Sequence, residues 1–127
     1  MKTCRGLRGA TTASENSADA ILDATRELLT GLIAANQLDV DDVASAIFTL
    51  TPDLDAAFPA RAARELGWSQ VALLDMAAPR VPGDIARCIR VLIHWNTERL
   101  AHELVHVYLR DARTLRPDLD GGTGRGP

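Results

Sequence analysis

The stretch CIRVLIHW, residues 88–95, is an apolar run with one arginine in its middle. Its length and branched residues predict a buried strand, in which Arg90 shares a face with Leu92 and His94. Burying a guanidinium without a partner costs several kcal/mol. Since the neighbours of Arg90 on both sides are apolar, we expect its anion to come from elsewhere in the protein or from a ligand.

The segments on either side of this run alternate between strand and helix patterns. Pro59 stands where the first turn of a helix tolerates proline, and Gly67 stands where a helix end needs positive φ. Further strands are predicted at 4–13 (interrupted at its glycines), 43–50, 69–76 and 105–110, with helices at 17–36 and 59–67, a short turn at 40–44, and a helix or loop at 97–104. This order predicts an α/β or α+β fold with helices on one face of a sheet. Oligomerisation is expected to cover the sheet's edges.

Composition limits the functions open to the chain. With 127 residues and 46% hydrophobic content, it is expected to form one domain over 1–120, followed by a disordered glycine-rich tail at 121–127. The net charge of −3 argues against a nucleic-acid partner, and no apolar stretch is long enough for a membrane span. Because the N-terminal residues lack a secretory apolar core and Cys4 and Cys88 resemble reduced thiols, we expect a cytoplasmic protein.

HELVH, residues 102–106, suggests a zinc site. Two histidines four residues apart bind zinc when they share a helical face. However, the alternation of the following residues places His106 on a strand, and only Asp111, Asp118 or Asp120 could supply a third ligand. We therefore expect no metal, with both histidines as ordinary residues of the surface or of a sheet face.

Arginines form a second candidate site. They stand at the start, the middle or the end of apolar segments, and they include Arg5, Arg8, Arg61, Arg64, Arg90 and Arg116. Pairing with Glu65 one helical turn away would account for Arg61 without any ligand. The guanidinium fork suits a carboxylate or phosphate, so several forks converging on one pocket would bind a small polyanion.

The motifs RGLRGATT, TPDLDAAFPARAARELGW, CIRVLI, HVYL and LRPDL occur in this order along the chain. In order and spacing they resemble the small trimeric chorismate mutases of the AroH class. The resemblance covers the chain to about Asp120. It implies a mixed sheet with helices on one face, assembled as a trimeric pseudo-α/β-barrel with active sites between subunits. It also implies the [3,3]-sigmatropic rearrangement of chorismate to prephenate, in aromatic amino acid biosynthesis, without a cofactor.

The resemblance also implies roles for individual residues. Arg90 would contact the ether oxygen and the enolpyruvyl carboxylate of the substrate, and Arg8 and Tyr108 would hold that carboxylate. The implied substrate-binding residues are Arg8, Phe58, Arg61, Arg64, Leu74, Arg90, Tyr108, Leu115 and Arg116. Such a site acts by orienting the substrate and by stabilising charge as the C–O bond breaks.

LLDMAAP, residues 73–79, departs from the family pattern. Asp75 stands where the family has cysteine, and Ala78 stands where it has the glutamate that accepts a hydrogen bond from the ring hydroxyl. We expect that the carboxylate has moved, with Asp75 accepting the hydroxyl proton and balancing Arg90. The catalytic residues would then be Arg90 and Asp75.

Other functions stay open. The chain could be a mutase-like protein with another substrate, a non-catalytic trimer that binds chorismate-like ligands, or the zinc hydrolase that HELVH suggests.

Overall fold

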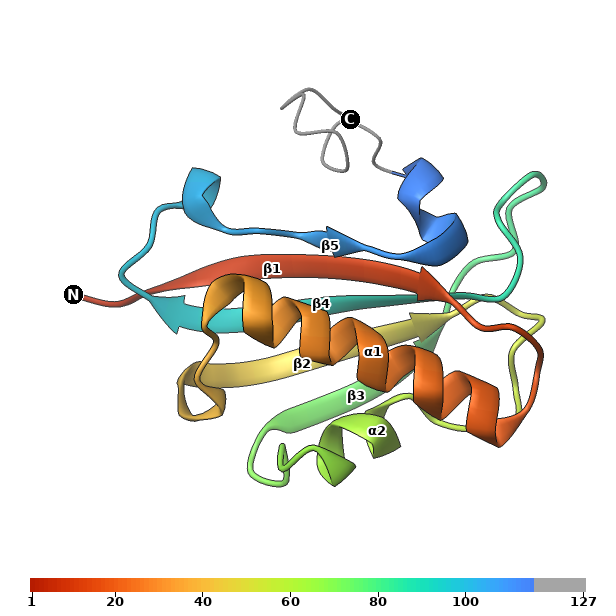
Figure 1. Ribbon diagram of the computed structural model, residues 1–127, viewed down its shortest axis with the longest axis horizontal. Coiled ribbons are helices and arrows are strands. Elements are labelled where there is room, and N and C mark those ends of the chain that lie inside the picture. The colour runs from red at the N-terminus through yellow and green to blue at the C-terminus, as the bar shows by residue number, and fades with distance from the viewer. Residues whose placement is uncertain (116–127) are drawn as a thin grey trace.

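The computed structural model describes residues 1–115, which form a five-stranded mixed sheet with two α-helices on one face (Figure 1). The strands are β1 Thr3–Thr12, β2 Val43–Leu50, β3 Ala72–Ala77, β4 Cys88–Thr97 and β5 Val107–Tyr108. The helices are α1 Ala18–Asn36 and α2 Ala60–Glu65, with the short 3₁₀ helices η1 Val40–Asp42, η2 Ala101–Glu103 and η3 Arg110–Leu115. This is the predicted fold class.

The strands lie in the order β3-β2-β4-β1-β5. The central strand β4 is antiparallel to both β1 and β2, while β3 pairs parallel with β2 and β5 pairs parallel with β1. The apolar run 88–95 therefore lies in the central strand of the sheet. Arg90 is on this central strand, close to the end at which the strand begins.

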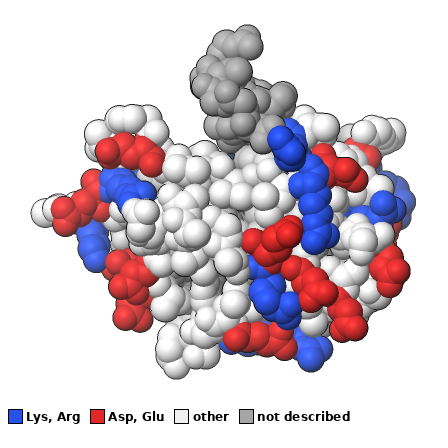
Figure 2. Space-filling view, viewed as in Figure 1, with Lys and Arg blue, Asp and Glu red and all other residues white. Residues whose placement is uncertain are grey.

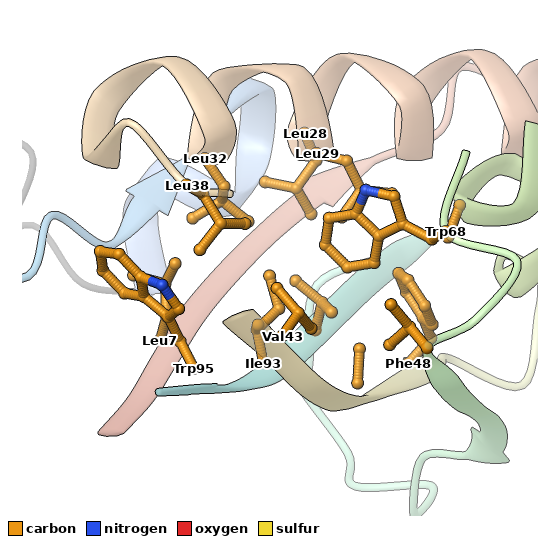
Figure 3. Close-up of a cluster of buried hydrophobic side chains, with 14 of the residues drawn as sticks. Leu7, Leu28, Leu29, Leu32, Leu38, Val43, Phe48, Trp68, Ile93 and Trp95 are labelled. Atoms are coloured by element: carbon orange, nitrogen blue, oxygen red, sulfur yellow. The ribbon is translucent and has the colours of Figure 1, made fainter. Parts of the chain in front are cut away.

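Helix α1 covers the sheet with one apolar face. Its first turn is capped by Ser17, whose Oγ accepts a hydrogen bond from the Ala20 N–H at 3.1 Å. The side chains of Leu28, Leu29 and Leu32 are fully buried between the helix and the strands (Figure 3). Each such leucine contributes roughly 1.5–3 kcal/mol to folding, so this layer of side chains fixes α1 on the sheet.

The other face of the sheet carries no α-helix within residues 1–115, and only the 3₁₀ helix η3 packs there, with Ala112 against Ala10 and Cys88. Alternation along β2 sends Phe48 into the core and Ile47 and Thr49 to the opposite side. We call this side, which also carries Arg90 and Leu92 of β4, the open face. Its apolar residues are partly exposed, so it is the surface on which a further layer could pack.

The helix-covered side is charged but mixed in sign. Figure 2 shows basic and acidic side chains next to one another over its lower right. Two of the ion pairs on α1 join Arg26 to Asp23 at 2.8 Å and Arg110 to Glu27 at 3.1 Å. None of the described helices is long and apolar enough to cross a membrane.

Most of the predicted elements are confirmed, including the long helix and the strand at 43–50. The first strand was expected to break at its glycines, but β1 runs unbroken. A Cβ on Gly9 would lie 3.0 Å and 3.1 Å from Leu32 and Leu28 and 3.1 Å from the Val107 carbonyl oxygen, so this glycine allows close packing rather than a turn.

The last two strand predictions were too long. The segment 69–76 was expected to be extended throughout, but β3 begins only at Ala72. The strand expected at 105–110 is reduced to Val107 and Tyr108, because Arg110 takes a left-handed conformation, with φ of 52°, and starts η3.

Candidate active site

Arg90 lies near the start of β4, the central strand, where it pairs with Thr49 of β2 and Ala10 of β1, and its side chain points to the open face. Its Nη2 donates to Oδ1 of Asp84 at 3.0 Å, and the Arg90 and Asp84 side chains are 31% and 23% exposed. One anion that Arg90 meets therefore belongs to the protein, and it lies only 6 residues upstream in the sequence.

A cavity of about 510 Å³ opens beside Arg90 on the open face, and we call it the basic pocket. It brings together four of the predicted residues, Arg8, Arg90, Tyr108 and Leu115. The remaining lining is mainly apolar and consists of Gly9, Ala10, Ile47, Thr49, Val91 and Leu92. Two guanidinium groups and a phenol above an apolar floor suit a small ligand that carries carboxylates.

Strand pairing places the two other polar groups of the basic pocket. Tyr108 is 8% exposed, and its strand β5 pairs Tyr108 with Ala10 of β1. The backbone N–H of Arg8 donates to Nδ1 of His106 at 3.0 Å, just before β5. The two ends of the chain described here thus meet beside Arg90, although the residues are about a hundred positions apart.

A second cavity, of about 640 Å³, adjoins the first and shares Thr49 and Arg90 with it. Its other wall is the end of β3 and the loop that follows it, so we call it the loop pocket. This wall consists of Met76, Ala77, Ala78, Pro79, Val81, Pro82, Gly83 and Asp84. Arg90 therefore has space on two sides, even though one carboxylate already contacts it.

A third cavity, of about 590 Å³, contains a separate group of the predicted residues, Phe58, Arg61, Arg64 and Asp75. We call it the Phe58 pocket, because the ring of Phe58 is 69% exposed there. The predicted pair between Arg61 and Glu65 is confirmed, with Nε 3.5 Å from Oε2. No residue from this group lines the basic pocket within residues 1–115.

Asp75 points away from Arg90. In the sheet it pairs with the buried Phe48, whose partner in β4 is Val91, whereas Arg90 pairs with Thr49. Neighbouring residues of a strand point to opposite faces, so Asp75 lies on the helix-covered side and Arg90 on the open face. The expectation that Asp75 lines the same pocket as Arg90 is wrong within a single chain.

The Asp75 carboxylate instead caps the start of α2. Its Oδ1 accepts the Ala60 N–H at 3.0 Å. Burial raises the pKa of Asp75, against the smaller lowering effects of that hydrogen bond and of the charge on Arg64.

Leu74, a further predicted residue, lies apart from these cavities. Leu74 is 54% exposed on the open face, opposite Ile47 in the parallel pair of β3 and β2. Arg116 lies outside the described residues, so its predicted role stays a prediction.

Cys88 stands close to Arg90 but is not a candidate nucleophile. Its side chain is completely buried, and burial raises the pKa of the thiol to about 11, with the Arg90 charge acting weakly in the opposite direction. At neutral pH it is protonated, and a thiol must lose its proton to attack a substrate.

The two histidines of HELVH do not share a helix face. His102 lies in η2, which ends at Glu103, and residues 104–106 are not helical. No group of three His, Cys, Asp or Glu that could hold a metal ion occurs within the described part of the chain.

Sequence reasoning missed Asp84 and the floor residues Ile47, Thr49 and Leu92. The floor could have been found only by knowing which strands pair with β4. For Asp84 there was a signal in VPGDI, because Pro-Gly is typical of a tight turn that reverses the chain.

Three comparisons with known proteins agree. The family model described as chorismate mutase type I matches residues 4–119. The chain is 49% identical over 117 residues to "Chorismate mutase AroH" of Thermus thermophilus, covering 91% of this chain and 96% of that protein. It is 41% identical over 116 residues to "Chorismate mutase AroH" of Bacillus subtilis, covering 91% of each. A solved chorismate mutase structure from Clostridium thermocellum superposes with a TM-score of 0.85 at 48% identity, covering 87% of this chain and 98% of that one.

Proposed function

Because the chain belongs to the chorismate mutase type I family and is a chorismate mutase, an isomerase, we propose that it converts chorismate to prephenate in the basic pocket, with Arg90 as the central cation. The observation that carries this proposal is the meeting of Arg8, Arg90 and Tyr108 around one cavity. These residues come from three different strands, so their meeting depends on the fold.

The first task of the site is to fix the shape of the substrate. In the rearrangement the C–O bond of the enol ether breaks while a C–C bond forms across the ring, within one molecule and without gain or loss of a proton. Arg8 and Tyr108 hold the enolpyruvyl carboxylate, and Leu115 packs against the arm. Holding the arm over the ring supplies orientation that the free substrate lacks.

The second task is to stabilise charge. Negative charge develops on the ether oxygen if the C–O bond breaks ahead of C–C formation, and the N–H groups of Arg90 are placed to meet it. The Arg90 side chain is 31% exposed, so its charge is only partly screened by water. This interaction is stronger in the transition state than in the substrate and therefore raises the rate.

The Phe58 pocket completes the site from a neighbouring subunit in this proposal. We infer a homotrimer in which Phe58 covers the substrate and Arg61 and Arg64 attract its ring carboxylate. The support is that these residues line a cavity separate from Arg90, with an exposed aromatic ring. In that arrangement the neighbour's Asp75 is the group that accepts the ring hydroxyl, since Asp75 and Arg90 of one chain face opposite ways.

Mixing two inactive variants tests the shared site. Arg90→Ala and Arg64→Ala damage opposite halves, so trimers reassembled from both contain some sites with both arginines intact. We expect each variant alone to be nearly inactive and the mixture to recover activity. A mixture as inactive as its components would place both arginines in sites built from one chain.

The role in metabolism follows the resemblance. We propose that the enzyme, acting over residues 1–120, supplies prephenate for aromatic amino acid biosynthesis in the cytoplasm. Its two cysteines, Cys4 and Cys88, are both free thiols, as suits a reducing compartment.

A mutase-like protein with a different substrate is the competing function, and the absence of a carboxylate at Ala78 favours it. The loss of chorismate absorbance on adding purified enzyme, with and without a chelator, decides between these functions. We expect turnover that survives chelation and depends on Arg90. Binding of chorismate without turnover would indicate a non-catalytic sensor. Hydrolysis that a chelator stops would indicate a zinc enzyme.

A further inference from the structure

We propose that Asp84 is the positioning residue of this enzyme: its carboxylate holds the Arg90 guanidinium in the orientation that the reaction needs. The inference rests on the proposed function of the basic pocket. It begins from the hydrogen bond between Arg90 Nη2 and Asp84 Oδ1, at 3.0 Å, which joins the loop between β3 and β4 to the middle of the sheet.

A tight turn places the Asp84 carboxylate. In VPGD the Asp84 N–H donates to the Val81 carbonyl oxygen at 3.1 Å, and Gly83 has a φ of 86°. Proline second and glycine with positive φ third are the signature of a type II turn. The Asp84 Oδ1 also accepts the Ile85 N–H at 2.9 Å, which restrains the carboxylate.

The pair sits where orientation matters. Both side chains are less than a third exposed, at 31% and 23%, so their interaction is screened less than that of a surface pair. A guanidinium has five N–H donors, and Arg90 uses one on Nη2 for its hydrogen bond to Asp84. Among the described residues, the Arg90 side chain makes no other hydrogen bond, so its remaining donors can bind a ligand. Asp84 thus holds the guanidinium without lining the basic pocket.

Ala78 gives the inference a second support. It lines the loop pocket together with Asp84 and Arg90, and it stands where the resemblance places a glutamate. A carboxylate at position 78 would therefore lie in the cavity that Asp84 and Arg90 share. The negative charge beside Arg90 is therefore retained in this chain, but it comes from a residue six positions further on.

The Asp84→Ala variant tests the role. We expect kcat to fall on the order of 10- to 100-fold, the size of effect that a misplaced catalytic group produces. The KM is expected to stay the same or fall, because removing a negative charge beside the cavity strengthens attraction for a dianionic substrate. A merely damaged fold would not give this split between kcat and KM.

A second substitution should restore the rate. In Asp84→Ala combined with Ala78→Glu, a carboxylate again lies beside Arg90, so we expect kcat to recover at least in part. The matched control is Asp23→Asn, which removes an acid from an exposed arginine pair on α1, with the Asp23 side chain 68% exposed. This control should leave both kinetic constants unchanged.

The outcomes separate this inference from the proposed function. If the wild type is active and Asp84→Ala keeps its kcat, the role of Asp84 is wrong while the proposed function stands. The same holds if Asp84→Ala loses activity and the added Ala78→Glu does not restore it. A wild type that leaves chorismate unchanged overturns the proposed function itself.

Discussion

The Arg90 guanidinium is fixed by its own strand and by the turn that precedes that strand. Its strand sets the face of the sheet on which it lies, through pairing with Thr49 and Ala10. The turn at Gly83 sets the carboxylate that contacts it. Alternation along 88–95 predicted the first of these, whereas the second depends on a loop conformation that no hydrophobic pattern encodes.

Replacing Arg90 with alanine should nearly abolish turnover. Loss of one preorganised donor costs about 2.7–4 kcal/mol of transition-state stabilisation, which corresponds to roughly 10²–10³ in kcat. We expect circular dichroism and the oligomeric state to stay unchanged, since a partly exposed side chain is removed. Arg90→Lys is the matched variant, because it keeps the charge and loses the fork. A near-normal rate in Arg90→Ala would remove this residue from the mechanism.

Asp75 should make stability depend on pH. Its pKa is raised by burial, so the folded state binds its proton more tightly than the unfolded state does. Stability then falls as pH rises through the raised pKa. Asp75→Asn removes this titration and can still accept the Ala60 N–H. We therefore expect the difference in free energy of unfolding, variant minus wild type, to increase from acid to neutral pH. Urea titration at each pH measures it.

The exposed acid Asp23, replaced by asparagine, controls for the loss of one negative charge. Parallel pH curves for wild type and Asp75→Asn would contradict the expected titration. Turnover of Asp75→Ala, measured separately, tests its other role: a large loss supports Asp75 as the acceptor of the ring hydroxyl, and an unchanged rate removes it.

At the scale of elements, strand β1 and helix α1 are brought together at Gly9. The sequence predicted both elements from their periodicities, but it suggested that glycine would break the strand. In the structure Gly9 instead admits the ends of Leu28 and Leu32 and the backbone of β5. Close approach between distant segments is a property of packing, so a single glycine in a strand pattern could not reveal it.

Gly9→Ala should therefore destabilise the fold and disturb Tyr108. The new Cβ would lie 3.1 Å from the Val107 carbonyl oxygen, which belongs to the backbone and cannot rotate away. We expect a loss of about 1–3 kcal/mol, the usual cost of overpacking. Urea unfolding at fixed protein concentration measures it. Gly31→Ala, where the nearest atom to the Cβ is 3.5 Å away, is the milder comparison.

At the scale of the whole molecule, the open face leaves the sheet with one layer of helices. Leu74 and Met76 are 54% and 50% exposed there. The hydrophobic pattern predicted a sheet with helices on one side, yet it could not show which half of the arginine set would line which cavity. That division depends on the strand order, in which β2 separates β3 from β4.

Leu74→Glu should prevent assembly. In the proposed trimer, a glutamate on this apolar face would be buried against a neighbouring subunit without a partner. Light scattering should then give the mass of a single chain, with turnover lost as well. Leu100→Glu is the matched control, because Leu100 is 52% exposed but precedes η2 rather than lying on the sheet. A full-mass Leu74→Glu assembly would show that this part of the face is not an interface.

The pair between Arg90 and Asp84 has a consequence for the solution in which the enzyme works. A cationic pocket that supplies its own counterion offers little to chloride, because a monovalent guest would have to compete with a carboxylate that is already tethered in place. Only a guest that engages several donors at once gains enough to enter. Chloride salts should therefore inhibit the wild type weakly.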